Sequence, residues 1–285
     1  MDFYKILSRL PFKRFKEPPP TVAVLRLAGV IGSLGPMRQG LTLADLGSRI
    51  ERAFKLPRLK AVALEINSPG GSPVQSALIA RRIRALAEQH DVPVYAFAED
   101  VAASGGYWLA TAGDEIYADD SSIVGSIGVI SAGFGFQGLI ERFGIERRVH
   151  TSGDKKALLD PFKPEDPDDV ARLEAVQVEI HEHFKAQVRA RRGDRLTADD
   201  EMLFSGEFWT GGRALELGLI DGLGDLNQVL RERYGDKVVV KRLEPKRPWW
   251  KKTFGASAAE TGPASWADGL LASLQERAHW ARFGL

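Results

Sequence analysis

The chain has 285 residues, of which 44% are hydrophobic and 27% charged, and its formal net charge is +1. This composition is typical of a globular protein with a buried core, and the charge balance gives no indication of a nucleic-acid partner. The chain contains no cysteine, which excludes disulfides, thiolate chemistry and cysteine-ligated zinc. We expect neither a metal nor any other cofactor.

The first 20 residues form a basic segment that ends in three consecutive prolines. Its apolar residues recur at helical spacing, so residues 1–20 are predicted to be an amphipathic tail, either solvated or resting on an anionic membrane surface. The segment lacks the apolar run and cleavage site of a secretory signal. The longest uncharged stretch, residues 121–140, carries four serines and five glycines, which argues against a transmembrane helix. We therefore expect a cytoplasmic protein, with peripheral contact at the inner membrane as an alternative.

Strands and helices are predicted to alternate along the first half of the chain. Buried strands are expected at residues 21–27, 60–66 and 92–98, because apolar residues run together there. Helices are expected after Thr42 and after Ser72, where each residue begins a capping box. This order predicts an α/β fold with a mostly parallel sheet and surrounding helices.

The second half is predicted to be more helical. A long helix with one apolar stripe is expected to begin at Asp166 and to end at Gly193. A short helix is expected near Thr210, and a late strand at residues 237–243. The last segment, residues 245–285, is predicted to be a linker followed by a C-terminal amphipathic helix.

Two glycine-rich loops follow the second and third predicted strands, at Asn67–Gly71 and after Ser104. The carboxyl ends of parallel strands meet at one edge of a sheet, where sites usually lie. Ser104 stands before a helix start, whose free N–H groups favour negative charge, so it is the strongest nucleophile candidate. The alternative is a serine that only caps a buried helix. The N–H groups of Gly71 and Gly105 are candidate donors to a developing oxyanion.

Five motifs together resemble signal peptide peptidase A and its SohB-type relatives. They are NSPGG at 67–71, AASGGYW at 102–108, GSIGV at 125–129, SGDKKALLDPF at 152–162 and WTGGRALELGLIDGLG at 209–224. The motifs stand in the family's order, although NSPGG alone is shared with the caseinolytic protease and crotonase folds.

The resemblance implies a ClpP/crotonase-like fold and a serine endopeptidase that uses a Ser–Lys dyad. The family's nucleophile matches Ser104, its general base matches Lys156, and the serine that orients the lysine matches Ser126. Its oxyanion glycine falls within Gly70 and Gly71. The implied substrates are signal-peptide remnants, small apolar peptides or unfolded protein segments. The resemblance also implies a homo-oligomer.

A lysine works as a general base only in its neutral form. Its pKa in water is about 10.4, and burial among apolar groups lowers that value by several units. The apolar side chains of residues 157–162 are expected to bury Lys156 in this way. The alternative is that Lys155 and Lys156 are solvated charges in a loop.

Histidine is the commoner partner of a nucleophilic serine. His150 is the one histidine considered for that role, because it is predicted to lie on a strand close to the lysine loop. His181 and His183 stand two residues apart in a predicted helix and face different ways, so we interpret them as a solvated face.

Residues 21–244 are thus predicted to form a peptidase domain, and two other functions stay open. The first is a crotonase-like acyl-CoA enzyme, whose glycine loops would bind a thioester oxyanion. Neither glycine loop supplies the acidic groups that such an enzyme needs. The second is a non-catalytic, membrane-associated scaffold, and the presence of both dyad residues argues against it.

Overall fold

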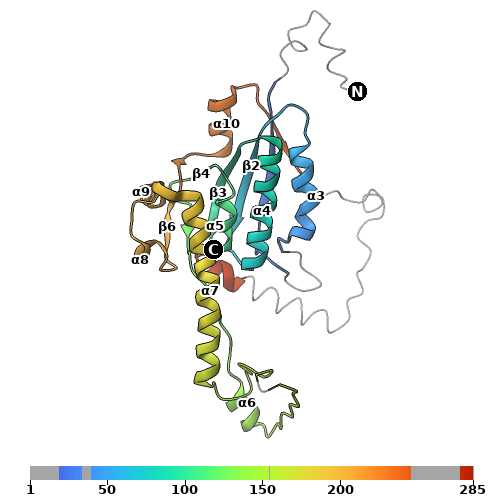
Figure 1. Cartoon of the computed structure of the whole chain (residues 1–285), viewed down its shortest axis with the longest axis vertical. Helices are drawn as coiled ribbons and strands as arrows, with labels where there is room; N and C mark the ends of the chain where they lie inside the picture. The colour runs from blue at the N-terminus through green and yellow to red at the C-terminus, as the bar shows by residue number, and fades with distance from the viewer. Residues whose placement is uncertain (1–18, 34–39, 154, 245–276, 285) are drawn as a thin grey trace, which may run out of the picture.

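The computed structural model describes residues 19–33, 40–153, 155–244 and 277–284 (Figure 1). The basic tail at residues 1–18 and most of the predicted C-terminal helix lie outside these residues. Contact of the tail with a membrane therefore stays a prediction. None of the helices in the described ranges is long and apolar enough to cross a membrane.

A mostly parallel sheet forms the centre of the molecule. The main path of the sheet runs β6-β5-β3-β2-β1-β8, and β4 branches from β3 to pair with β7. All of these pairs are parallel except β5–β6. The strands are β1 (Thr21–Ala28), β2 (Leu59–Ser68), β3 (Val94–Ala103), β4 (Glu115–Ala118), β5 (Ile123–Gly125), β6 (Phe208–Thr210), β7 (Gly222–Leu223) and β8 (Val239–Arg242). The predicted α/β class is confirmed.

Helices cover both faces of this sheet (Figure 1). On one face, α3 (Leu43–Phe54) and α4 (Pro73–His90) pack over the central strands and bury the larger apolar core. On the other face, α10 (Leu226–Tyr234) packs over residues of β1, β2 and β3. The predicted caps are confirmed, because the hydroxyls of Thr42 and Ser72 accept backbone N–H groups at the starts of α3 and α4.

The remaining helices follow the third strand. They are α5 (Gly105–Ala110), α6 (Gln137–Arg142), α7 (Pro167–Arg192), α8 (Asp200–Leu203) and α9 (Gly211–Glu216). The stretch 121–140, which the sequence argued against as a membrane span, forms β5, an irregular segment and the start of α6.

Only the C-terminal half of α7 packs on the rest of the protein. Phe184 and Val188 are buried, and the Phe184 ring stacks on Trp108 with 4.7 Å between centroids. The first half of α7 has no buried residue, and it projects away from the sheet with α6 beside its far end (Figure 1). We call residues 129–153 and 155–180 the arm.

The arm exposes large apolar side chains. Phe134 is 81% exposed, Phe143 is 70% exposed and Ile130 is 63% exposed. No residue of α6 is buried. All three side chains come from residues 130–143, and large apolar patches on a protein surface mark interaction sites. The apolar stripe predicted along α7 is therefore only partly covered within one chain.

A buried ion pair ties the C-terminal end of α7 to the body. The Arg192 guanidinium lies 2.6 Å from the Asp221 carboxylate, which also accepts the N–H of Ile116. The Arg192 side chain is 2% exposed. Burial would raise the pKa of Asp221, but the hydrogen bond and charge of Arg192 outweigh burial and hold this pKa below its usual range. The pair therefore stabilises the fold above about pH 4, and that stabilisation is lost as the pH falls through the lowered pKa.

We expect Asp221→Asn to lower the free energy of unfolding at pH 7 by roughly 3 kcal/mol, because it leaves the Arg192 charge buried without a counter-charge. Denaturant titration at pH 7 and at pH 3.5 measures the change, which shrinks at the lower pH because the Asp221 carboxyl of the unfolded chain takes up a proton there while the native one stays ionised. The exposed Asp236 gives the matched control, Asp236→Asn, with an effect of about 0.5 kcal/mol or less. A loss of equal size at both pH values would contradict this account.

Candidate active site

Ser104 stands at a sharp turn between β3 and α5. Its backbone angles are φ 52° and ψ −123°, a conformation that costs a non-glycine residue about 1–3 kcal/mol. Two hydrogen bonds hold the turn, from the Ser104 N–H to the Gly125 carbonyl at 2.8 Å and from the Trp108 N–H to the Ser104 carbonyl at 3.0 Å. A strained strand-to-helix turn of this kind presents a nucleophile at the end of a sheet.

Gly70 lies directly against Ser104. A Cβ atom on Gly70 would stand 2.8 Å from the Ser104 Cβ, 3.0 Å from its Oγ and 2.9 Å from the Gly105 nitrogen. The φ of Gly70 is +104°, which residues with side chains rarely adopt. Both the space and the backbone conformation therefore require glycine at this position.

Two backbone N–H groups beside Ser104 are free. The Gly70 N–H donates to the Ser68 Oγ at 3.2 Å. The N–H groups of Gly71 and Gly105 have no hydrogen-bond partner within the described ranges. Chemically, such a pair of free donors suits a group that develops negative charge.

The Gly71 loop is held from its other side by Ile31. The Ile31 N–H donates to the Gly70 carbonyl at 2.8 Å, and the Ile31 carbonyl accepts the Ser72 N–H at 2.8 Å. A Cβ atom on Gly71 would stand 2.1 Å from the Ile31 oxygen. This close approach of the two backbones fixes the position of the loop relative to β1.

Ser126 lies in the segment that pairs with the end of β3. Ala103 pairs with Gly125, and Ser126 follows with a left-handed φ of 51°. Ser126 is 4% exposed, and its N–H donates to the Glu207 carbonyl at 2.6 Å. The fold therefore brings Ser126 to the same strand ends as Ser104 and the glycine loop.

Lys156 is not brought to this place within one chain. It lies in a turn between α6 and α7, where its side chain is exposed. Its backbone N–H donates to the Gly153 carbonyl at 3.1 Å. In the described part of the chain, its side chain makes no hydrogen bond with Ser104 or Ser126. The expected burial of Lys156 by the apolar run after it is absent from the single chain.

The histidines differ from their sequence interpretation. His150 is exposed and lies in an irregular segment, so the predicted strand there is wrong. His181 is half-buried, and its Nε2 lies 3.1 Å from the Ile127 carbonyl, next to Ser126. The interpretation of His181 as part of a solvated face is therefore wrong, whereas His183 is exposed as expected. No sequence signal pointed to His181, because its partner lies 54 positions away.

Two aromatic residues that follow Ser104 belong to the core. Tyr107 is fully buried and donates its hydroxyl hydrogen to the Leu219 carbonyl at 2.7 Å. Trp108 is 7% exposed and stacks on Phe184. Neither one is available as the wall of an open substrate pocket.

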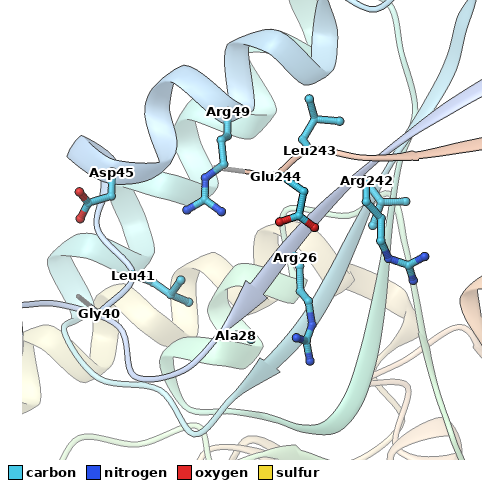
Figure 2. Close-up of a pocket in the computed structure, with 10 residues that line it drawn as sticks. Arg26, Ala28, Gly40, Leu41, Asp45, Arg49, Arg242, Leu243 and Glu244 are labelled. Atoms are coloured by element: carbon cyan, nitrogen blue, oxygen red, sulfur yellow. The ribbon is translucent and has the colours of Figure 1, made fainter. Parts of the chain in front are cut away.

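No cluster of metal-ligating side chains occurs among the described residues. A cavity of about 330 Å³ does occur, but it lies at β1 and α3 rather than at Ser104 (Figure 2).

Comparison with known proteins finds relatives whose names fall into two groups. It is 50% identical, over 98% of its length, to a Brucella abortus protein named "Na(+)/H(+) antiporter NhaA". It is 34% identical, over 71% of its length, to an Enterococcus faecium protein named "Putative signal peptide peptidase SppA". The chain spans 39% of the first relative and 60% of the second.

The fold and the family agree with the sequence-based resemblance. A solved structure of the "1510-N membrane-bound stomatin-specific protease", a serine-to-alanine mutant, matches with a TM-score of 0.50 and 18% identity. The match covers 81% of this chain and all of that one. The model of "Peptidase family S49" matches residues 87–239, which include Ser104, Ser126 and Lys156. The chain belongs to peptidase family S49, a family of serine-type peptidases.

Proposed function

We propose that the protein is a serine endopeptidase in which Ser104 is the nucleophile and the N–H groups of Gly71 and Gly105 hold the oxyanion. The observation that carries this proposal is the strained turn at Ser104, with two free N–H groups beside it. A helix cap would not need the left-handed φ, because N-cap residues normally have extended backbone angles. Membership in family S49 favours this function over an acyl-CoA enzyme or a scaffold.

The reaction follows from these groups. The Ser104 Oγ attacks the carbonyl carbon of the scissile peptide while its proton passes to a neutral amine base. The carbonyl oxygen takes up negative charge and is held by the two N–H groups. The base then gives the proton to the leaving amine as the C–N bond breaks. Water, deprotonated by the same base, releases the acyl group from Ser104.

Lys156 is the proposed base, and we propose that it reaches Ser104 from a second copy of the chain. Three observations support this arrangement. Lys156 is exposed, it belongs to the arm, and the arm carries apolar side chains that one chain leaves uncovered. Packing the arm on a neighbouring copy would cover that surface. It would also remove water from around the lysine, as a lysine base requires.

The proposed substrates are extended peptides, including signal-peptide remnants, small apolar peptides and unfolded protein segments. A peptide must be extended to place its carbonyl carbon at a serine that stands between two glycine loops. The name of the Enterococcus relative agrees with this class.

Ser104→Ala is expected to abolish the cleavage of a denatured protein and of a mixed peptide pool, as read by mass spectrometry. Wild-type protein cleaves both, because only it has the Oγ nucleophile. Equal cleavage by Ser104→Ala would show that another group or a contaminant is responsible. Absence of cleavage by the wild type would refute the peptidase proposal under those conditions.

Ser104→Gly is expected to be equally inactive but more stable than Ser104→Ala, by about 1 kcal/mol. Glycine relieves the strain of the left-handed φ, whereas alanine keeps it. Denaturant titration of the two variants measures the difference. If alanine were as stable as glycine here, the turn would not be strained in solution.

Mixing two inactive variants tests whether the dyad is shared between copies. Co-expressed Ser104→Ala and Lys156→Ala are expected to recover about a quarter of wild-type activity, because half of the copies supply the serine and half supply the lysine of a neighbour. The control is each variant expressed alone. No recovery in verified mixed oligomers would place both dyad residues in one chain.

His181 is expected to position the Ser126 segment through its bond to the Ile127 carbonyl. His181→Ala should lower kcat roughly tenfold or more with little change in KM, because small displacements at a reacting centre are costly. His181→Gln should restore much of kcat, since an amide N–H can donate to the same carbonyl. His183→Ala, at an exposed position on the same helix, is the control. A similar loss in His183→Ala would point to a general effect on α7.

A further inference from the structure

The edge strand β8 covers only the first half of β1. The two strands pair over Thr21–Val24, and the last hydrogen bond runs from the Leu243 N–H to the Val24 carbonyl at 2.9 Å. The edge of β1 on the opposite side pairs with β2 over its whole length, to Ala28. From Val24 onward, therefore, β1 has a neighbour on one side only among the described residues.

The open edge presents the backbone groups of Arg26 and Ala28. Alternate residues of a strand direct their N–H and C=O groups to the same neighbour, so Arg26 and Ala28 follow Val24 in facing the β8 side. Neither residue has a backbone hydrogen bond on that side within the part of the chain that the structure describes. Beyond them the edge is closed again, where the Leu41 N–H donates to the Val30 carbonyl at 2.9 Å.

The cavity of about 330 Å³ lies along this open edge (Figure 2). Its lining includes Val24, Arg26 and Ala28 of β1, together with Leu41 and Leu243 at the two ends. The volume lies near the lower limit of ligand pockets, which is about 300 Å³. An unpaired strand edge along a cavity is the arrangement by which proteins bind peptides as an added strand.

Arg49 supplies a charge to the cavity. It points from α3 toward the space beside β1 (Figure 2). Arg26 is paired with Glu99 at 2.9 Å, and Arg242 is paired with Glu65 at 2.6 Å. Arg49, by contrast, has no ion pair or hydrogen bond within the described ranges. Burial lowers its pKa, while Asp45 and Glu244 only partly offset that effect.

We propose that this groove binds an extended peptide segment of another polypeptide, which adds as a strand to β1 and places a carboxylate against Arg49. The Arg26 and Ala28 groups give the backbone hydrogen bonds, two donors and two acceptors in alternation. Burial removes part of the hydration of the Arg49 guanidinium, and its donors have no partner among the residues that the structure describes. A carboxylate would bind such a guanidinium in bidentate form. No residue of the Ser104 site lines the groove, so its test does not depend on peptidase activity.

Hydrogen exchange of the full chain tests the strand addition directly. The inactive Ser104→Ala chain would be mixed with an eight-residue peptide of alternating valine and threonine that carries one central glutamate. We expect the Arg26 and Ala28 amides to exchange quickly in the free protein and at least tenfold more slowly with the peptide bound. Protection of both amides without peptide would mean that the protein's own chain fills the groove, which overturns the proposal. Fast exchange in both states also overturns it.

Matched peptides and variants test the carboxylate. Fluorescence anisotropy is expected to show the glutamate peptide binding about tenfold more tightly than its glutamine counterpart, as a charge-assisted hydrogen bond predicts. Arg49→Gln should remove this difference, and Arg81→Gln, at an exposed position on α4, should keep it. Equal affinity for the two peptides, or an unchanged difference in Arg49→Gln, would refute the role of Arg49.

Discussion

The close packing of glycine backbone between β2, β3 and α5 is the constraint on which the rest of the site depends. A Cβ atom at Gly70 would collide with Ser104, and one at Gly106 would stand 2.4 Å from the Ser68 carbonyl oxygen. These approaches bring two strand ends and one helix start together without intervening side chains. Two consequences follow, a serine forced into a left-handed turn and N–H groups left free beside it. Both consequences arise because glycine has no Cβ atom, and neither depends on an added side-chain interaction.

Such a site can be strained because the surrounding structure is rigid. The turn at Ser104 is held between the fully buried Tyr107 on one side and the β5 segment on the other. Most residues of β2 and β3 are buried. A core of this kind can hold a conformation that costs about 1–3 kcal/mol, because relaxing the turn would disturb many packed contacts.

The elements of the body could be predicted from local sequence, and the arrangement of the arm could not. The strands at Thr21 and Leu59 are apolar runs, and the helices after Thr42 and Ser72 begin at capping residues, so each signal lies within a few positions. The short β5 and β6 strands do not stand out in the sequence, because each has three residues and their antiparallel pairing joins distant positions, as in Val124 with Trp209, 85 positions apart. The apolar stripe of α7 was predicted correctly. Its sequence does not tell, however, whether another part of the chain or another molecule covers it.

The residues of the candidate site also divide into those that local sequence predicts and those that it does not. Ser104, Gly70 and Gly71 follow predicted strands, and the parallel order alone brings them to one edge. Lys156 was assigned through the family resemblance, and no local signal fixes where its loop lies in space. His181 was misinterpreted because a helix position is judged by its own helix, whereas its partner Ile127 comes from a distant segment.

Lys156 and the apolar side chains of the arm are both exposed to water, and one covering surface would remove water from both. A lysine in water carries a proton and cannot take another, so a Ser–Lys peptidase needs a dry surface around its base. Under the proposed shared dyad, Lys156 would meet Ser104 only where another copy covers the arm. Assembly would then supply both position and desolvation in one step, and the free chain would be inactive by construction. That coupling would restrict peptide cleavage to the assembled form, in which the active sites face a surface shared between copies.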